Sequence, residues 1–113
     1  MDIYGWSDIP EKHVFEGARR RTIVGEKVLI LRQWWEPGCE GPGLHSHAEE
    51  EQFTLVLEGE VEVTVDGEKA TLRAGQVVRF PPGSQHMTRA VGDRPTFLEE
   101  VFSPVPEAIA RQA

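Results

Sequence analysis

Short alternating segments separated by turn signals cover most of this chain from Gln52 onward. Val61, Val63 and Val65 alternate with polar residues, and Asp66-Gly67 follows them as a two-residue hairpin signal. Further strands are expected at 19–24, 27–36, 70–72, 76–80, 86–90 and 96–102, and only 105–113 looks helical. Many short strands with closely spaced turns predict an all-β sandwich or barrel.

Two of the expected strands carry apolar residues on faces that a small barrel has difficulty covering. Residues 28, 30 and 34 share one face of the 27–36 strand, and Leu29, Leu31 and Trp35 share the other. In the strand that starts at Gln52, residues 52, 54 and 56 share one face and Phe53, Leu55 and Leu57 the opposite one. One short chain is expected to leave the Leu29 and Phe53 sets partly uncovered, which predicts a homodimer.

Three of the four histidines lie in two short segments. His45-Ser46-His47 follows a Pro- and Gly-rich loop, and His86 follows Pro81-Pro82-Gly83. On an extended segment His45 and His47 point to the same side and can hold one ion between them. Imidazole nitrogens with a nearby oxygen donor suit zinc, iron, nickel or manganese, so the sequence predicts a divalent transition-metal site. His13 stands apart from both segments and is interpreted as a solvent or packing residue.

The spacing of these segments resembles that of the cupin superfamily. In the first cupin motif, His-x-His is followed by a ligand position and then, after six intervening residues, by a Gly; here these are His45, His47, Gln52 and Gly59. In the second motif, Gly, Pro-x-Gly and His correspond to Gly75, Pro81, Gly83 and His86. The resemblance implies a single-domain cupin jelly-roll β-barrel over 1–113, with an N-terminal arm (1–16), a barrel (17–104) and a short C-terminal tail (105–113).

The fourth metal ligand has two candidates. Gln52 stands where most cupins carry a Glu, and both its spacing to Gly59 and its strand phase fit. Glu51 better suits a dication by charge, but it would lie on the Phe53 face. Glu49 and Glu50 are interpreted as a solvated acidic turn. The predicted ligand set is therefore His45, His47, His86 and Gln52, with Glu51 as the alternative.

One subgroup of cupins shows further similarity. The run Gly17-Ala18-Arg19-Arg20, the Gln after His-x-His, and the ending Glu100-Val101-Phe102-Ser103-Pro104 resemble the KdgF-type cupins. That family linearises 4,5-unsaturated uronates, and the resemblance implies a catalytic acid/base at Glu100. The family's usual Arg is replaced by Pro106, so a carboxylate clamp would have to come from Arg19, Arg79 or Arg89. The alternative for Glu99 and Glu100 is a pair of surface acids.

Composition excludes several other functions. The formal charge of −7 argues against nucleic acid or an anionic membrane as the main partner. No apolar run approaches membrane-spanning length, the first residues lack a signal-peptide pattern, and the single cysteine, Cys39, does not call for an oxidising compartment. A cytoplasmic protein is therefore expected.

The leading hypothesis is a metal-dependent isomerase- or lyase-type enzyme of carbohydrate metabolism that acts on a small organic or sugar acid. Three neutral histidines and a neutral amide leave the double charge of the ion uncompensated, which favours Lewis-acid chemistry. A non-catalytic module that binds a small ligand and a cupin dioxygenase with a redox metal are the two alternatives, because the fold alone does not determine function.

Overall fold

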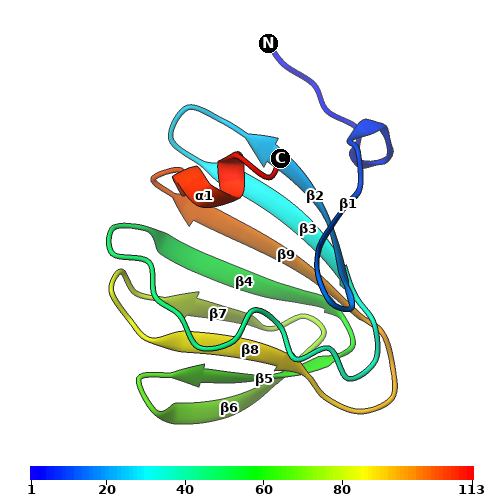
Figure 1. Cartoon of the computed structure of the whole chain (residues 1–113), viewed down its shortest axis with the longest axis vertical. Coiled ribbons are helices and arrows are strands. Elements are labelled where there is room, and N and C mark those ends of the chain that lie inside the picture. Colours follow the sequence, from blue (N-terminus) through cyan, green and yellow to red (C-terminus); the bar gives the residue numbers. More distant parts are fainter.

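The computed structural model describes all 113 residues, and β-strands make up about half of them (Figure 1). The elements in chain order are η1 (Trp6–Asp8), β1 (Lys12–Phe15), β2 (Ala18–Val24), β3 (Leu29–Trp35), β4 (Glu51–Glu58), β5 (Glu60–Val65), β6 (Glu68–Arg73), β7 (Val77–Phe80), β8 (His86–Ala90), β9 (Thr96–Ser103) and α1 (Glu107–Ala110). One sheet has the order β1-β2-β3-β9-β4-β7 and the other the order β6-β5-β8. All paired strands are antiparallel, and the predicted all-β jelly roll is confirmed.

The interior is formed by alternate residues of the central strands. In β3 every second residue from Leu29 to Trp35 is buried, and in β9 the same holds from Thr96 to Phe102. In β4, Gln52, Thr54 and Val56 are buried, as the predicted strand phase requires. Polar residues thus share the inner face with apolar ones, and this mixture leaves a polar site inside the barrel.

One part of the argument for a homodimer is wrong. Leu29 and Leu31 are completely buried within the chain, and Trp35 is nearly so. Phe102 and the tail residues Val105 and Ile109 pack around the two leucines. The face that the sequence assigned to a second copy is therefore covered by β9 and by the C-terminal tail, whose packing cannot be read from the β3 pattern alone.

Two elements near the chain ends differ from expectation. Residues 12–15 form β1, although their sequence has no period of two, because β1 pairs with β2 through an irregular register. The helix expected over 105–113 is a single turn, α1, which lies beside the ends of β3 and β9 (Figure 1). The hairpin at Asp66-Gly67 is as predicted, with both residues at positive φ. No helical segment of the chain has the length and apolar character needed to cross a lipid bilayer.

The long connection between β3 and β4 runs beside β8. Its Cys39 carbonyl accepts a hydrogen bond from the Ala90 amide at 2.8 Å, and its His47 carbonyl accepts one from the Gly83 amide at 2.7 Å. Between these points His45 and His86 form an isolated antiparallel bridge. These contacts place the connection against the strand that begins with the third histidine.

Candidate metal centre

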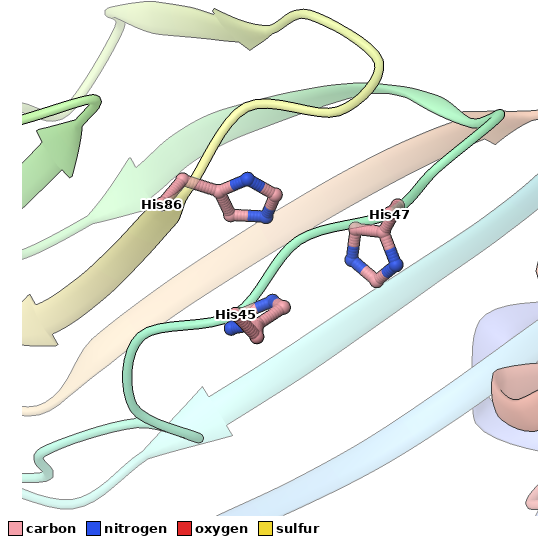
Figure 2. A group of neighbouring side chains, drawn as sticks. All are labelled: His45, His47 and His86. Atoms are coloured by element: carbon pink, nitrogen blue, oxygen red, sulfur yellow. The ribbon is translucent and has the colours of Figure 1, made fainter.

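Two separate segments bring the three histidines together. His45 and His47 come from the connection that precedes β4, and His86 is the first residue of β8. The amide of His45 donates to the carbonyl of His86 at 3.0 Å, and the amide of His86 donates back to the carbonyl of His45 at 2.8 Å. Figure 2 shows the three imidazoles around a common space. Each can offer a ring nitrogen within 4.8 Å of the others, so the structure brings the three predicted histidines together in a group that could hold a metal ion.

Hydrogen bonds to main-chain carbonyls orient two of these rings. The Nδ1 of His45 lies 2.7 Å from the Gly43 carbonyl oxygen, and the Nδ1 of His86 lies 3.1 Å from the Ser84 carbonyl oxygen. A carbonyl only accepts, so each Nδ1 carries the proton and each Nε2 keeps its lone pair. The Nε2 of His86 is buried and has no hydrogen-bond partner. This arrangement is typical of metal-ligating histidines, whose second nitrogen is held by a carbonyl or carboxylate.

Burial favours the uncharged forms of His47 and His86. It lowers the pKa of His86 to about 4, and the neighbouring His45 and His47 contribute to the shift. The pKa of His47 is lowered for the same reasons, burial first and the charge of His45 second. Neutral imidazole is the form that binds a metal ion, so protons compete weakly for this site at neutral pH.

Gln52 meets the requirements for a fourth ligand better than Glu51 does. Its Nε2 donates to Thr54 Oγ1 at 3.0 Å and to Glu100 Oε2 at 2.6 Å, while its Oε1 is buried without a partner. Glu51 points to the outer side, where its Oε2 accepts from Arg79 Nε at 2.5 Å. Two unpartnered buried atoms, His86 Nε2 and Gln52 Oε1, thus belong to residues that line one cavity, and the donor set fits a divalent ion.

The two acids of β9 have different environments. Glu99 pairs with Arg32 at 2.9 Å on the outer face, as a surface acid does. Glu100 is buried on the inner face. Its Oε1 accepts from Gln33 Nε2 at 2.5 Å, and its Oε2 accepts from Gln52 at 2.6 Å and from Thr54 Oγ1 at 2.8 Å. Burial raises the pKa of Glu100, opposed by the hydrogen bonds from Thr54 and Gln33 and by the charge of Arg20.

The three histidines, Gln52 and Glu100 line one cavity of about 230 Å³. A cavity of this size accepts one small molecule. Four polar residues to which the sequence pattern gave no role in the site also line it: Arg20, Gln33, Thr88 and Gln112. Gln33 accepts a hydrogen bond from Trp35 Nε1 at 3.1 Å, which fixes the amide that donates to Glu100. The alternation of β3 could have identified Gln33, since it shares the buried face with Leu29, Leu31 and Trp35.

The three arginines expected to supply a carboxylate clamp do not lie in this cavity. Arg19, Arg79 and Arg89 point outward and pair with Glu11, Glu51 and Glu62, respectively. Arg20 lines the cavity instead, because in β2 it shares the buried face with Ala18. His13, Glu49 and Glu50 are not among the lining residues.

Comparison with known proteins gives the family. The profile of the cupin domain matches residues 31–102, well over half of the chain. A polyketide synthase protein, CurC of Streptomyces cyaneus, is 39% identical over 61 residues, which are 54% of this chain and 40% of CurC. Quercetin 2,3-dioxygenase of Bacillus subtilis is 37% identical over 51 residues, which are 45% of this chain and 15% of that enzyme. Both matches span less than half of the curated relative's length.

Solved structures show the same fold over nearly the whole chain. KdgF from a Halomonas species superimposes with a TM-score of 0.87 and 21% identity, covering 96% of this chain and 98% of that one. An RmlC-like cupin from Shewanella frigidimarina gives 0.87 and 25%, covering 96% of each chain. A predicted oxalate decarboxylase from Thermotoga maritima gives 0.82 and 19%, covering 92% of this chain and all of that one. This chain belongs to the cupin family, and its three histidines form a group that can hold a metal ion.

Proposed function

We propose that this cupin is a metal-dependent enzyme that acts on a small sugar acid such as a 4,5-unsaturated uronate. His45, His47, His86 and Gln52 would hold a divalent transition metal. Such an ion, when bound, supplies Lewis acidity toward substrate oxygens, because all four ligands are neutral. The uronate class rests on the residues shared with KdgF-type cupins, from Gly17 to Arg20 and from Glu100 to Pro104.

The observation that carries the proposal is the hydrogen bond between Gln52 and Glu100. One end of the Gln52 amide donates to the buried carboxyl at 2.6 Å, and the other end is the unpartnered oxygen proposed as a ligand. A proton carrier is therefore held one side chain away from the proposed ion. Buried carboxyls with a raised pKa are found preferentially at catalytic sites.

Glu100 has the hydrogen-bonding capacity to move a proton. Its Oε2 accepts two hydrogen bonds and its Oε1 accepts one, so Oε1 keeps a lone pair for a proton of the substrate. Gln33 and Thr54 hold the carboxyl in place, and burial favours its protonated form. As the carboxylate, Glu100 would take a proton at Oε1 from one substrate atom, and the protonated form, which burial favours, would then return it to another.

The direct assay is incubation with unsaturated galacturonate and mannuronate in the presence of zinc, nickel, manganese or iron. We expect loss of the alkene absorbance with at least one metal. Glu100→Gln should reduce turnover about 10²- to 10⁴-fold while metal content, measured by elemental analysis, stays the same. His86→Gln should lose both metal and turnover.

Glu99→Gln is the matched control, since Glu99 is the neighbouring acid and faces outward against Arg32. It should retain wild-type turnover. If no added metal supports consumption of either uronate, the uronate proposal is wrong. Consumption of oxygen in place of alkene loss would favour a dioxygenase, and binding of uronate without turnover would favour a binding module.

A further inference from the structure

Arg20 is a buried cation without a direct ion pair; the buried Glu100 acts on it through its charge but does not contact it. Only 9% of the residue is exposed, and its Nε is buried with no hydrogen-bond partner. Its guanidinium makes one hydrogen bond, from Nη1 to the Gln112 side-chain oxygen at 3.0 Å. No carboxylate oxygen lies within 4.0 Å of it. Burying a charge in this way is costly unless a partner of opposite charge joins it.

The other arginines of the chain show how unusual this environment is. Seven of them have a glutamate within 4.0 Å, and all of those pairs are at least partly exposed. The remaining one, Arg94, is exposed to solvent. Arg20 is thus the arginine that is both buried and unpaired, and it lines the same cavity as the three histidines and Glu100.

The guanidinium is held in a fixed orientation by the C-terminal tail. Gln112 accepts the hydrogen bond from Nη1, and the main-chain oxygen of Ala113 accepts one from Lys12 on the neighbouring strand β1. Ile109 packs on the Leu29, Leu31 and Phe102 cluster and also lines the cavity. The edge of the guanidinium formed by Nε and Nη2 has no acceptor in the protein. That edge offers two parallel N–H groups, the geometry that matches a carboxylate.

We propose that Arg20 binds the carboxylate of the ligand through this free edge, while Gln112 positions the guanidinium from its other side. The ligand class rests on the proposed function: a sugar acid whose ring oxygens face the histidine group. Arg20 is then the residue that distinguishes an acid from the corresponding neutral sugar.

The test compares two ligands that differ mainly in the carboxylate, galacturonate and galactose. Their affinities for the metal-loaded protein are measured by isothermal titration calorimetry, and metal content is determined for every variant. We expect wild type to prefer galacturonate and Arg20→Gln to reduce this preference by roughly tenfold or more, because a charge-assisted two-point contact is lost. Arg19→Gln, which alters the adjacent outward arginine paired with Glu11, should keep the wild-type preference.

A second variant covers the case in which Arg20→Gln does not fold. Gln112→Glu places a carboxylate where an amide oxygen now lies 3.0 Å from Nη1, and this internal partner should lower galacturonate affinity and leave galactose affinity unchanged. The proposal is overturned if wild type does not prefer galacturonate, or if both variants keep the wild-type preference. If the preference depends on Arg20 but unsaturated uronates are not turned over, the carboxylate subsite stands and the proposed enzyme is refuted. If unsaturated uronates are turned over but the variants keep the wild-type preference, the enzyme stands and the subsite is refuted.

Discussion

At the scale of single residues, the three histidines can bind a metal ion only while they are neutral. The folded, metal-free protein holds the pKa of His86 at about 4, against 6.5 for a free histidine. The unfolded chain therefore binds more protons than the folded chain between these two values. The burial of His86 therefore destabilises the metal-free protein in acid, and a pH-dependent unfolding experiment can measure that effect.

We expect the free energy of unfolding of the metal-free protein to decrease as the pH falls from 6.5 to about 4. The shift of His86 accounts for up to about 3 kcal/mol of this loss. The raised pKa of Glu100 has the opposite effect on the free energy of unfolding. It stabilises the folded protein at low pH, and this stabilisation is lost as the pH rises above the ordinary carboxyl value. Urea denaturation in the presence of a chelator, at a series of pH values, is the measurement.

His86→Gln should remove much of this acid sensitivity. His13→Gln is the control, because His13 is exposed on β1 and away from the cavity; it should leave the pH dependence as in wild type. Equal pH dependence in wild type and His86→Gln would show that the loss of stability in acid has another origin.

The sequence predicted part of this site and could not predict the rest. The histidines and Gln52 were found because their spacing and strand phase are local properties of the chain. Arg20 was missed because it lies in a run of three arginines, of which only the pairing of β2 with β3 decides which one faces inward. The resemblance favoured Glu100, but which of the two acids faces inward is decided by the register of β9 against β3 and β4.

At the scale of elements, boundaries that depend on local turn residues could be predicted well from the sequence. Elements that depend on pairing between distant segments could not. The β5–β6 hairpin follows from Asp66-Gly67, whereas β1 exists only through its pairing with β2. The expected tail helix shortens to four residues, since a helix of this length depends on packing and not on its own propensity.

Gly59 at the β4–β5 turn is a position where the fold tolerates no side chain. Its φ is +86°, and an added Cβ would lie 2.7 Å from the Pro95 carbonyl oxygen and 2.9 Å from Thr96 Oγ1. Gly67 has the same φ of +86° with nothing within 4 Å of an added Cβ. Both Ala variants should lose about 1–2 kcal/mol from backbone strain, and Gly59→Ala should lose a further 1–3 kcal/mol, roughly, from overpacking.

Chemical denaturation of the two variants isolates the packing contribution, because the backbone strain is common to both. Equal free energies of unfolding for Gly59→Ala and Gly67→Ala would contradict the prediction and would show that the β4–β5 and β9 turns can move apart.

At the scale of the whole molecule, the outer face of the six-stranded sheet remains the candidate interface. Phe53 is 36% exposed on β4 and Val77 is 53% exposed on the adjacent β7. Leu55 and Leu57 lie on the same face of β4 and are half-buried. Apolar residues grouped on one sheet face favour self-association with two-fold symmetry.

We therefore expect a homodimer at micromolar concentration, measured by sedimentation velocity. Phe53→Asp should shift the protein to a monomer, because it places a charge in the centre of this face. Val28→Asp, at a 39% exposed position in the turn between β2 and β3, is the control and should remain dimeric. A wild-type monomer under these conditions would refute the expected dimer.

The reciprocal pair of amide hydrogen bonds between His45 and His86 has a consequence for kinetics. The same two residues join the β3–β4 connection to β8 and offer ring nitrogens to the proposed ion. An opening that separates them breaks both backbone bonds and removes two ligands at once. Hydrogen–deuterium exchange of these two amides and release of the ion would then be limited by the same opening event. The exchange rate of the two amide protons would therefore report the rate of metal release.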